Sequence, residues 1–253
     1  ESWRERFALK YFIRYAYSRA NAIVAISNGV ADDLAKSIAL NRERIEVIYN
    51  PVVDDYLLAL SNEAATQPWL EFGADPLILG VGRLTQTKDF ITLIRAFAKV
   101  RADRKARLVI LGEGDMREVL EAEVARLRLY NDVFLPGFVT NPFAPMCRAD
   151  LFVLSSAHEG FGNVIVEAMA CGLPVVSTDC PVGPSEILEN GKWGHLVPAG
   201  NVEAMAKAMI TTLDKAVQPD VSSRANYFSL SRAVEGYLKV LFPKSKKELC
   251  HLE

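Results

Sequence analysis

The sequence contains few cysteines, and their spacing matches none of the common metal or redox motifs. The four are Cys147, Cys171, Cys180 and Cys250, and no two of them are spaced as zinc ligands or as a Cys-x-x-Cys pair. Three lie in apolar or helix-like surroundings, where a small buried thiol is the usual role. We therefore expect a protein without bound metal in a reducing, cytoplasmic compartment.

Long apolar runs and a surplus of one charge sign are absent as well. No apolar stretch approaches the roughly 18 residues that a membrane span needs, and the opening Glu1-Ser2-Trp3-Arg4 is charged, unlike a signal peptide. The net charge of -2 gives no support for nucleic-acid binding. With 50% hydrophobic and 24% charged residues, the composition is typical of a soluble globular protein. An initiator Met is also absent, so we expect the natural start to lie elsewhere.

The middle of the chain alternates between short apolar runs and segments with helical periodicity. The runs predict buried strands over 77–81, 108–111, 133–135, 151–154 and 175–177. The periodic segments predict helices over 90–100, 116–127, 145–148, 164–170, 184–189 and 202–213. Strands that alternate with helices imply right-handed crossovers, so we expect an α/β fold built on a doubly wound parallel sheet.

Residues 1–60 form a different segment, which we interpret as the tail of a preceding α/β domain. It predicts helices over 7–20 and 30–40, the second capped by Ser27 or Asn28, and strands over 23–26 and 45–49. Residues 61–75 read as a linker, 76–216 as the main domain, and 217–253 as C-terminal helices, including 225–241, and a tail. The basic residues of the first helix, Arg4, Lys10 and Arg14, predict a solvated face, with contact to a membrane surface as the alternative.

The strongest chemical signal is the segment from Ser155 to Pro174, SSAHEGFGNVIVEAMACGLP. It follows a predicted strand, and open α/β sheets bind ligands beyond the carboxyl ends of their strands. Gly160 and Gly162 allow close approach of a ligand, and the N-terminus of the helix that follows favours an anion such as phosphate. Glu159 in the loop and Glu167 in the helix fit this anion site if each accepts hydrogen bonds from hydroxyl groups, as sugars supply.

A second signal is the segment from Gly80 to Asp89, GVGRLTQTKD, which also lies between a predicted strand and a predicted helix. Arg83 and Lys88 flank its short loop, where they are placed to clamp a diphosphate. The glycine spacing of dinucleotide-binding Rossmann proteins is not met, so the glycines alone are weak evidence.

Together these segments resemble the C-terminal domain of the GT-B glycosyltransferases of family 4. Further markers of the resemblance are Gly112-Glu113-Gly114, Pro136-Gly137-Phe138, and the two glutamates separated by seven residues. Residues 20–27 and 47–51 resemble the last strands of the family's N-terminal domain and the interdomain connection. The resemblance extends from about residue 20 to residue 213, and it implies a nucleotide-sugar-binding domain whose acceptor-binding partner domain is mostly missing.

The resemblance also implies roles for individual residues. Arg83, Lys88 and Glu159 are expected to be catalytic: the two cations bind the donor's diphosphate and Glu159 contacts the transferred sugar. Glu167 is expected to accept hydrogen bonds from the ribose hydroxyls. The remaining expected donor contacts are Gly82, Gly112, Phe138, Val139, Phe161, Gly162, Asn163 and Val164. Phe138 is equally consistent with a core position, and Glu113 with ordering its own turn.

By the same resemblance, the expected activity is retaining transfer of a hexose or N-acetylhexosamine from a nucleotide diphosphate sugar, a UDP-sugar, to a glycan or lipid-linked acceptor. The nucleotide sugar is a co-substrate, and no cofactor is expected. Since no Asp-x-Asp occurs, Arg83 and Lys88 are expected to stabilise the negative charge of the diphosphate in place of a divalent metal ion. We expect these residues alone to bind donor and to transfer poorly. Two alternatives remain, a GT-B sugar-nucleotide epimerase and a non-catalytic nucleotide-sugar-binding module.

Overall fold

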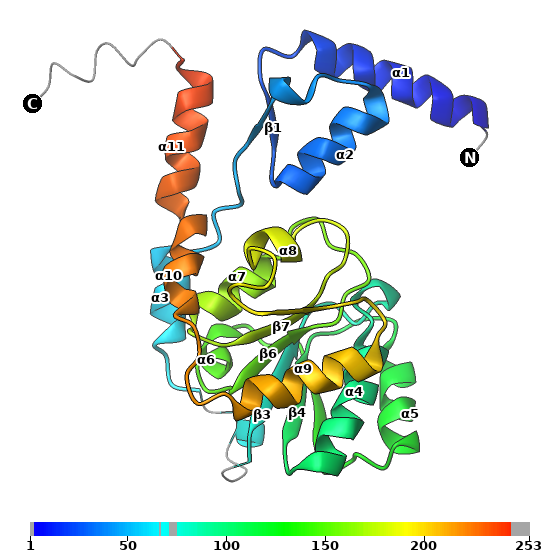
Figure 1. Ribbon diagram of the computed structural model, residues 1–253, viewed down its shortest axis with the longest axis vertical. Helices are drawn as coiled ribbons and strands as arrows, with labels where there is room; N and C mark the ends of the chain where they lie inside the picture. Colours follow the sequence, from blue (N-terminus) through cyan, green and yellow to red (C-terminus); the bar gives the residue numbers. More distant parts are fainter. Residues whose placement is uncertain (1–2, 66, 71–74, 244–253) are drawn as a thin grey trace, which may run out of the picture. The chain divides into compact units, whose positions relative to one another are not determined.

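A parallel β-sheet organises the larger part of this computed structural model. The structure describes residues 3–65, 67–70 and 75–243, and only the backbone of residues 3–10 and 68. The chain divides into two units, Val52–Tyr227 and a smaller one formed by Glu1–Pro51 with Phe228–Glu253 (Figure 1). Three expected features lie outside the described side chains. They are part of the expected linker, the basic residues Arg4 and Lys10 of the first helix, and the tail with Cys250.

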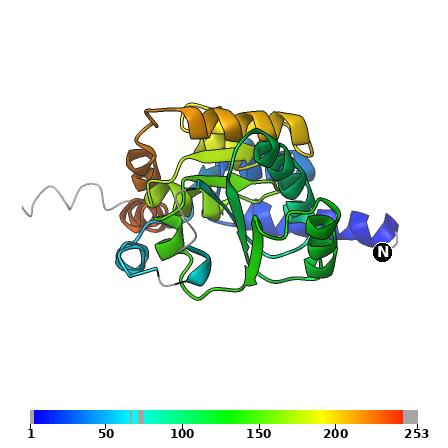
Figure 2. The same ribbon diagram turned by 90° about the horizontal axis from the view of Figure 1, so that it is seen from below.

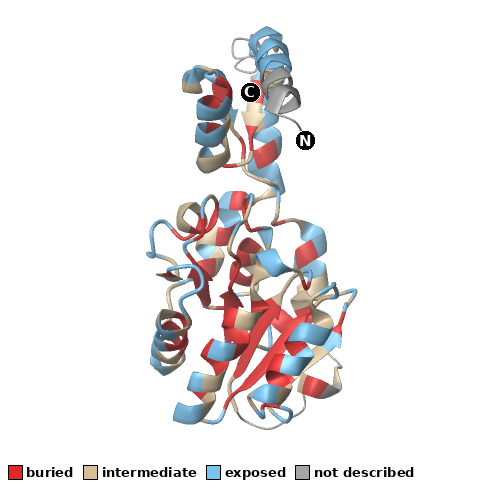
Figure 3. Ribbon diagram, turned by 90° about the vertical axis from the view of Figure 1, so that its right-hand side faces the viewer, coloured by how far each residue is buried: buried red, intermediate tan, exposed pale blue. Residues whose placement is uncertain are grey.

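The sheet of the larger unit has the strand order β5-β4-β3-β6-β7-β8, and every neighbouring pair is parallel. The strands are β3 (Leu77–Val81), β4 (Arg107–Leu111), β5 (Val133–Gly137), β6 (Leu151–Leu154), β7 (Val175–Thr178) and β8 (His195–Val197). Every residue of β4 and β6 is buried (Figure 3), as expected for strands covered on both faces. The expected doubly wound parallel sheet is therefore confirmed. Its order reverses between β3 and β6, which makes the gap between their carboxyl ends the topological switch point.

Helices cover both faces of this sheet (Figures 1 and 2). Alternate strand residues such as Ile78, Ile110 and Val153 share one hydrophobic core with residues of α4 (Phe90–Asp103), α5 (Arg117–Arg126) and α9 (Val202–Asp214). Helix α7 (Asn163–Ala170) packs against β6 and β7, and contacts α6 (Phe143–Met146), α8 (Pro184–Ile187) and α10 (Val221–Ala225). Both layers start their helices next to the carboxyl ends of strands.

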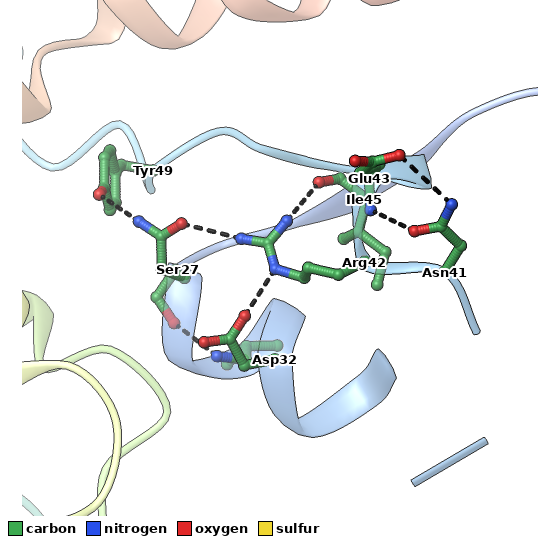
Figure 4. Close-up of polar contacts among 9 residues, drawn as sticks. Ser27, Asp32, Asn41, Arg42, Glu43, Ile45 and Tyr49 are labelled. Atoms are coloured by element: carbon green, nitrogen blue, oxygen red, sulfur yellow. Dashed lines mark hydrogen bonds and ion pairs between the residues drawn. The ribbon is translucent and has the colours of Figure 1, made fainter. Parts of the chain in front are cut away.

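The smaller unit contains α1 (Trp3–Arg19), β1 (Ile23–Ala25), α2 (Asn28–Ile38), β2 (Ile45–Val47) and α11 (Leu230–Leu241). Strands β1 and β2 pair in parallel, and Ile23, Ala31 and Ile45 belong to one small core. The Ser27 hydroxyl caps α2 by accepting from the Val30 N–H at 3.1 Å, which decides between the two expected caps. Figure 4 shows the Arg42 guanidinium donating to Asp32 at 2.6 Å and to the Ile45 carbonyl at 2.9 Å, which ties α2 to β2.

Several expected boundaries differ from the observed ones. Helix α3 (Asp55–Ser61) was not expected because only Leu57 of its residues is buried, so the segment has no apolar stripe. It contacts α6, and Asn141 donates to the Leu60 carbonyl at 2.9 Å, so α3 belongs to the larger unit, which begins at Val52.

Other differences concern short elements. The expected helix 145–148 lies at Phe143–Met146, and β8 was missed because it has only three residues, one of them the exposed His195. The expected helix 225–241 is wrong at its start: α10 ends at Ala225, a 3-10 turn follows over Asn226–Phe228, and α11 begins only at Leu230.

A buried carboxylate joins α4 to α5. Glu123 is 7% exposed and accepts hydrogen bonds from Arg126 at 2.7 Å and from Arg95 of α4 at 2.6 Å. The hydrogen bonds from Arg126 and then from Arg95 lower the pKa of Glu123 to about 2, against the opposing effect of burial. Glu123 is thus a charged group whose ionised form the fold stabilises.

We expect Glu123→Gln to lower the free energy of unfolding at pH 7 by about 2 kcal/mol, because the variant loses the negative charge that accepts three hydrogen bonds from Arg95 and Arg126. The pKa is depressed on folding, so this contribution is present above the ordinary pKa of 4.5 and is lost as the pH falls through about 2. Urea unfolding at pH 7 and pH 3 measures it. Glu121→Gln is the matched control: this carboxylate pairs with Arg117 but is 53% exposed, so its loss should cost less than about 0.5 kcal/mol. Equal effects of the two substitutions would contradict the prediction.

Candidate functional site

Two loops meet at the switch point of the sheet, one after β3 and one after β6. The Ala157 N–H donates to the Thr87 carbonyl at 2.8 Å, and the Ser155 hydroxyl donates to the Lys88 carbonyl at 2.8 Å. These bonds hold together the two segments that the sequence singled out, although they lie far apart in the chain. The parallel pairing of β3 with β6 brings both loops to the same edge of the sheet.

An ion pair crosses this switch point. The Lys88 ammonium donates to Glu159 Oε1 at 2.5 Å, and the Ser156 hydroxyl donates to the same oxygen at 2.7 Å. The side chains are 23% exposed for Lys88 and 11% for Glu159, so water screens the pair little. Sequence reasoning placed these two residues in one site but did not anticipate their direct contact.

Glu167 lies one turn into α7 and is half-buried. Burial raises its pKa above the ordinary value, and the nearby positive charge of Lys88 opposes that shift. Within the described part of the chain, its carboxylate accepts no hydrogen bond, so both oxygens remain as acceptors for hydroxyl groups. Lys88 therefore interacts with both glutamates, one by direct contact and one by its charge.

The N-terminus of α7 faces the end of the same loop and has no side-chain cap. Its N-cap, Gly162, has a φ of +96°, a left-handed conformation that glycine adopts without strain. The loop after β7 supports this turn, because a Cβ built on Gly183 would lie 2.0 Å from the Phe161 carbonyl oxygen. The uncapped N–H groups and the helix dipole make this end of α7 suited to an anion.

A pocket of about 400 Å³ lies beside these residues, over the carboxyl ends of β3, β4 and β5. Five of the expected donor contacts line it: Gly82, Arg83, Gly112, Phe138 and Val139. The other four lining residues, Val81, Leu111, Glu113 and Pro142, were not expected to contact the donor. Val81 and Glu113 lie inside the motifs singled out above, whereas Leu111 and Pro142 lie at a strand end and in a loop outside them. Phe138 is 75% exposed, so it is not a core residue.

The pocket lies next to the Lys88 side chain. A Cβ built on Gly82 would lie 3.4 Å from Lys88 Cε, so the lysine side chain runs past the glycine that lines the pocket. Arg83 is exposed and makes no hydrogen bond or ion pair with the part of the chain that the structure describes. The expected residues thus form two groups, one around the pocket and one around Lys88, Glu159 and the start of α7.

Gly112 has a structural reason to be glycine. Its φ is +141°, and an added Cβ would lie 1.9 Å from the Gly82 carbonyl oxygen. The Gly82 N–H donates to the Leu111 carbonyl at 3.0 Å, so the loops after β3 and β4 lie in direct backbone contact. Glu113 turns to Arg117, which it binds at 2.7 Å, and so orders its own turn as expected.

Neither a metal cluster nor a membrane span is evident in the described residues. No group of three or more His, Cys, Asp or Glu residues is placed there to hold a metal ion. None of the helices described combines the length and apolar character needed to cross a bilayer.

Comparison with known families identifies the class of protein that this fold and site define. Residues 75–215 match the model of the glycosyl transferases group 1, and residues 1–56 match that of glycosyltransferase family 4. The first match covers more than half of the chain. The chain therefore belongs to the group 1 glycosyl transferases, as the sequence motifs indicated.

Particular relatives agree with this assignment. An N-acetylgalactosaminyltransferase from Campylobacter jejuni, named for the acceptor N-acetylgalactosamine-N,N'-diacetylbacillosaminyl-diphospho-undecaprenol, is 34% identical over 239 residues, which are 92% of this chain and 63% of the relative. The lipopolysaccharide core glycosyltransferase LpsE of Rhizobium meliloti is 31% identical over 92% of this chain and 68% of its own length. The chain thus spans about two thirds of these relatives.

Solved structures share the fold. A variant of S. aureus TarM in complex with fondaparinux, alpha-GlcNAc-glycerol and UDP has a TM-score of 0.75 and 23% identity, over 92% of this chain and 46% of that one. Anabaena HepE in complex with UDP has a TM-score of 0.73 and 25% identity, over 92% of this chain and 64% of that one. The GT-B fold expected from the motifs is confirmed.

We expect Gly112→Ala to destabilise the protein by roughly 2 kcal/mol or more, because the added methyl group meets the Gly82 carbonyl oxygen and the φ suits glycine. Thermal unfolding measures the change. Gly160→Ala is the matched control, since a Cβ there meets nothing within 4 Å, and its melting temperature should stay within a degree or so of the parent. A stable Gly112→Ala protein would show that this loop contact is not required.

Proposed function

We propose that this chain is the donor-binding part of a retaining glycosyltransferase. The donor is a nucleotide diphosphate sugar, a UDP-sugar carrying a hexose or N-acetylhexosamine, and the acceptor is a glycan or a lipid-linked sugar. One observation carries the proposal: Arg83 and Lys88 follow β3, the start of α7 follows β6, and these two strands pair in parallel, so all three lie at one edge of the sheet. Two cations and a helix N-terminus at one switch point suit a diphosphate.

The chemistry follows from where charge develops. When the bond between the anomeric carbon and the diphosphate breaks, negative charge grows on the leaving phosphate oxygens. Lys88 has three N–H donors, and Glu159 takes one of them, which leaves two for the diphosphate. Arg83 supplies further donors, and the dipole at the start of α7 adds partial positive charge. A preorganised donor of this kind is worth on the order of 3 kcal/mol of barrier.

The two glutamates divide the hydroxyl groups of the donor between them. Glu159 stays bound to Lys88 and Ser156 and contacts the transferred sugar through its remaining acceptor capacity. Glu167, with both oxygens available, accepts from the ribose hydroxyls. The pocket beside them receives the nucleobase against Phe138 and Val139.

The relatives support a UDP-sugar donor and a lipid-linked or glycan acceptor. TarM and HepE were solved with UDP, and the relative from C. jejuni is named for an acceptor on diphospho-undecaprenol. We propose that transfer requires an acceptor-binding domain in addition to the residues described, and that the reaction takes place on the cytoplasmic side of a membrane. The exposed Tyr11, Phe12 and Tyr15 of α1 suit peripheral contact with that surface.

We expect Arg83→Ala and Glu167→Ala each to weaken UDP binding about tenfold or more, since each removes charge-assisted or hydroxyl hydrogen bonds to the nucleotide. Isothermal titration with UDP at pH 7.5 measures the dissociation constant. Lys105→Ala is the matched control, because it removes one exposed positive charge at the opposite end of the strands and should bind as the parent does. Unchanged affinity in both site variants would refute the site assignment.

We further expect UDP binding to survive removal of divalent metal, because Arg83, Lys88 and the start of α7 neutralise the diphosphate. Titration after treatment with EDTA should give a dissociation constant within about twofold of that in added Mn²⁺. If the affinity for UDP fell about tenfold or more in EDTA, a metal ion would contribute to neutralising the diphosphate.

A further inference from the structure

Two cysteines that are far apart in the sequence come together behind the candidate site. Cys147 is the first residue after α6, and Cys171 is the first residue after α7. Both donate to one carbonyl oxygen: Phe143 O accepts from the Cys147 N–H at 3.0 Å and from Cys171 Sγ at 3.7 Å. Helices α6 and α7 pack against each other, so the two helix ends that carry these cysteines lie side by side.

The two thiols differ in their surroundings. Cys147 is exposed, whereas Cys171 is half-buried at the helix end. Burial, and then the neighbouring Cys147, raise the pKa of the Cys171 thiol well above its ordinary value. Cys147 is therefore the thiol that meets a reagent from solvent, and Cys171 is the inner thiol that reacts second.

We propose that Cys147 and Cys171 form a redox-active dithiol that closes into a disulfide on reaction with a low-molecular-weight disulfide such as oxidised glutathione. The Cys147 thiolate attacks oxidised glutathione, forms a mixed disulfide and releases one glutathione. The Cys171 thiolate then attacks Cys147 Sγ and releases the second glutathione. Two protein thiols are oxidised, one glutathione disulfide is reduced to two thiols, and the two thiol protons pass through solvent to the departing glutathione thiolates.

The bond would join the C-terminal ends of α6 and α7 covalently. Helix α7 carries Glu167, and the Cys171 N–H donates to the Glu167 carbonyl at 3.1 Å, so the modified residue belongs to the turn after that glutamate. In a reducing compartment the two cysteines stay as free thiols, and the disulfide forms when conditions become more oxidising.

The test uses the full chain with Cys250→Ser, which removes the tail thiol. Protein is incubated with mixtures of reduced and oxidised glutathione, alkylated and digested, and the peptides are identified by mass spectrometry. The expected result is a linked Cys147–Cys171 peptide pair, an intact mass lower by about 2 Da, a monomeric band on a non-reducing gel, and Cys180 still alkylated. Closure should accelerate as the pH rises, because Cys171 reacts as the thiolate.

Single variants separate closure from simple thiol reactivity. In Cys171→Ser, Cys147 should carry glutathione and no internal disulfide should form. In Cys147→Ser, Cys171 should resist the reagent, and Cys171→Ala serves as a second variant if Cys171→Ser does not fold. The inference is overturned if Cys147 and Cys171 in the Cys250→Ser protein remain two free thiols, or carry two separate glutathiones, across the whole range of mixtures.

Discussion

The reversal of strand order between β3 and β6 is the constraint on which the candidate site depends. The chain leaves β3 toward one side of the sheet and β6 toward the other, and the loops after both strands lie at the same edge of the sheet. Hydrogen bonds from the Ala157 N–H and the Ser155 hydroxyl to the loop after β3 hold the two loops together. Lys88 and Glu159 therefore meet in space although they lie on separate motifs of the chain.

Opposite charges lie close together at this switch point. A half-buried lysine next to two carboxylates avoids the cost of an unpaired buried cation, and Glu159 holds its ammonium group in one place. The low local dielectric strengthens every such interaction, including those with a developing phosphate charge. The start of α7, which no side chain caps, completes the arrangement, because the helix dipole adds partial positive charge without adding another side chain.

Much of the fold could be predicted because parallel strands and amphipathic helices leave strong periodic signals. β3, β4, β6 and β7 matched their expected ranges closely, and the helix carrying Glu167 began one residue early. The misses share a cause: α3 buries only Leu57, and β8 is short and part-exposed, so neither leaves a periodic pattern. The proximity of Cys147 and Cys171 was equally hidden, since it arises from the packing of α6 on α7 rather than from sequence spacing.

The sequence by itself determined the class of the protein, the doubly wound sheet and the types of residue at its carboxyl edge, because motifs and periodicity are local properties of the chain. Only the tertiary structure decided the contacts among those residues: that Lys88 pairs with Glu159, that Glu167 accepts no hydrogen bond from the residues described, and that Gly112 packs against the Gly82 carbonyl. These contacts depend on strand order, crossover direction and helix packing. Such long-range features place distant segments within a few ångströms of one another and leave no mark on spacing along the chain.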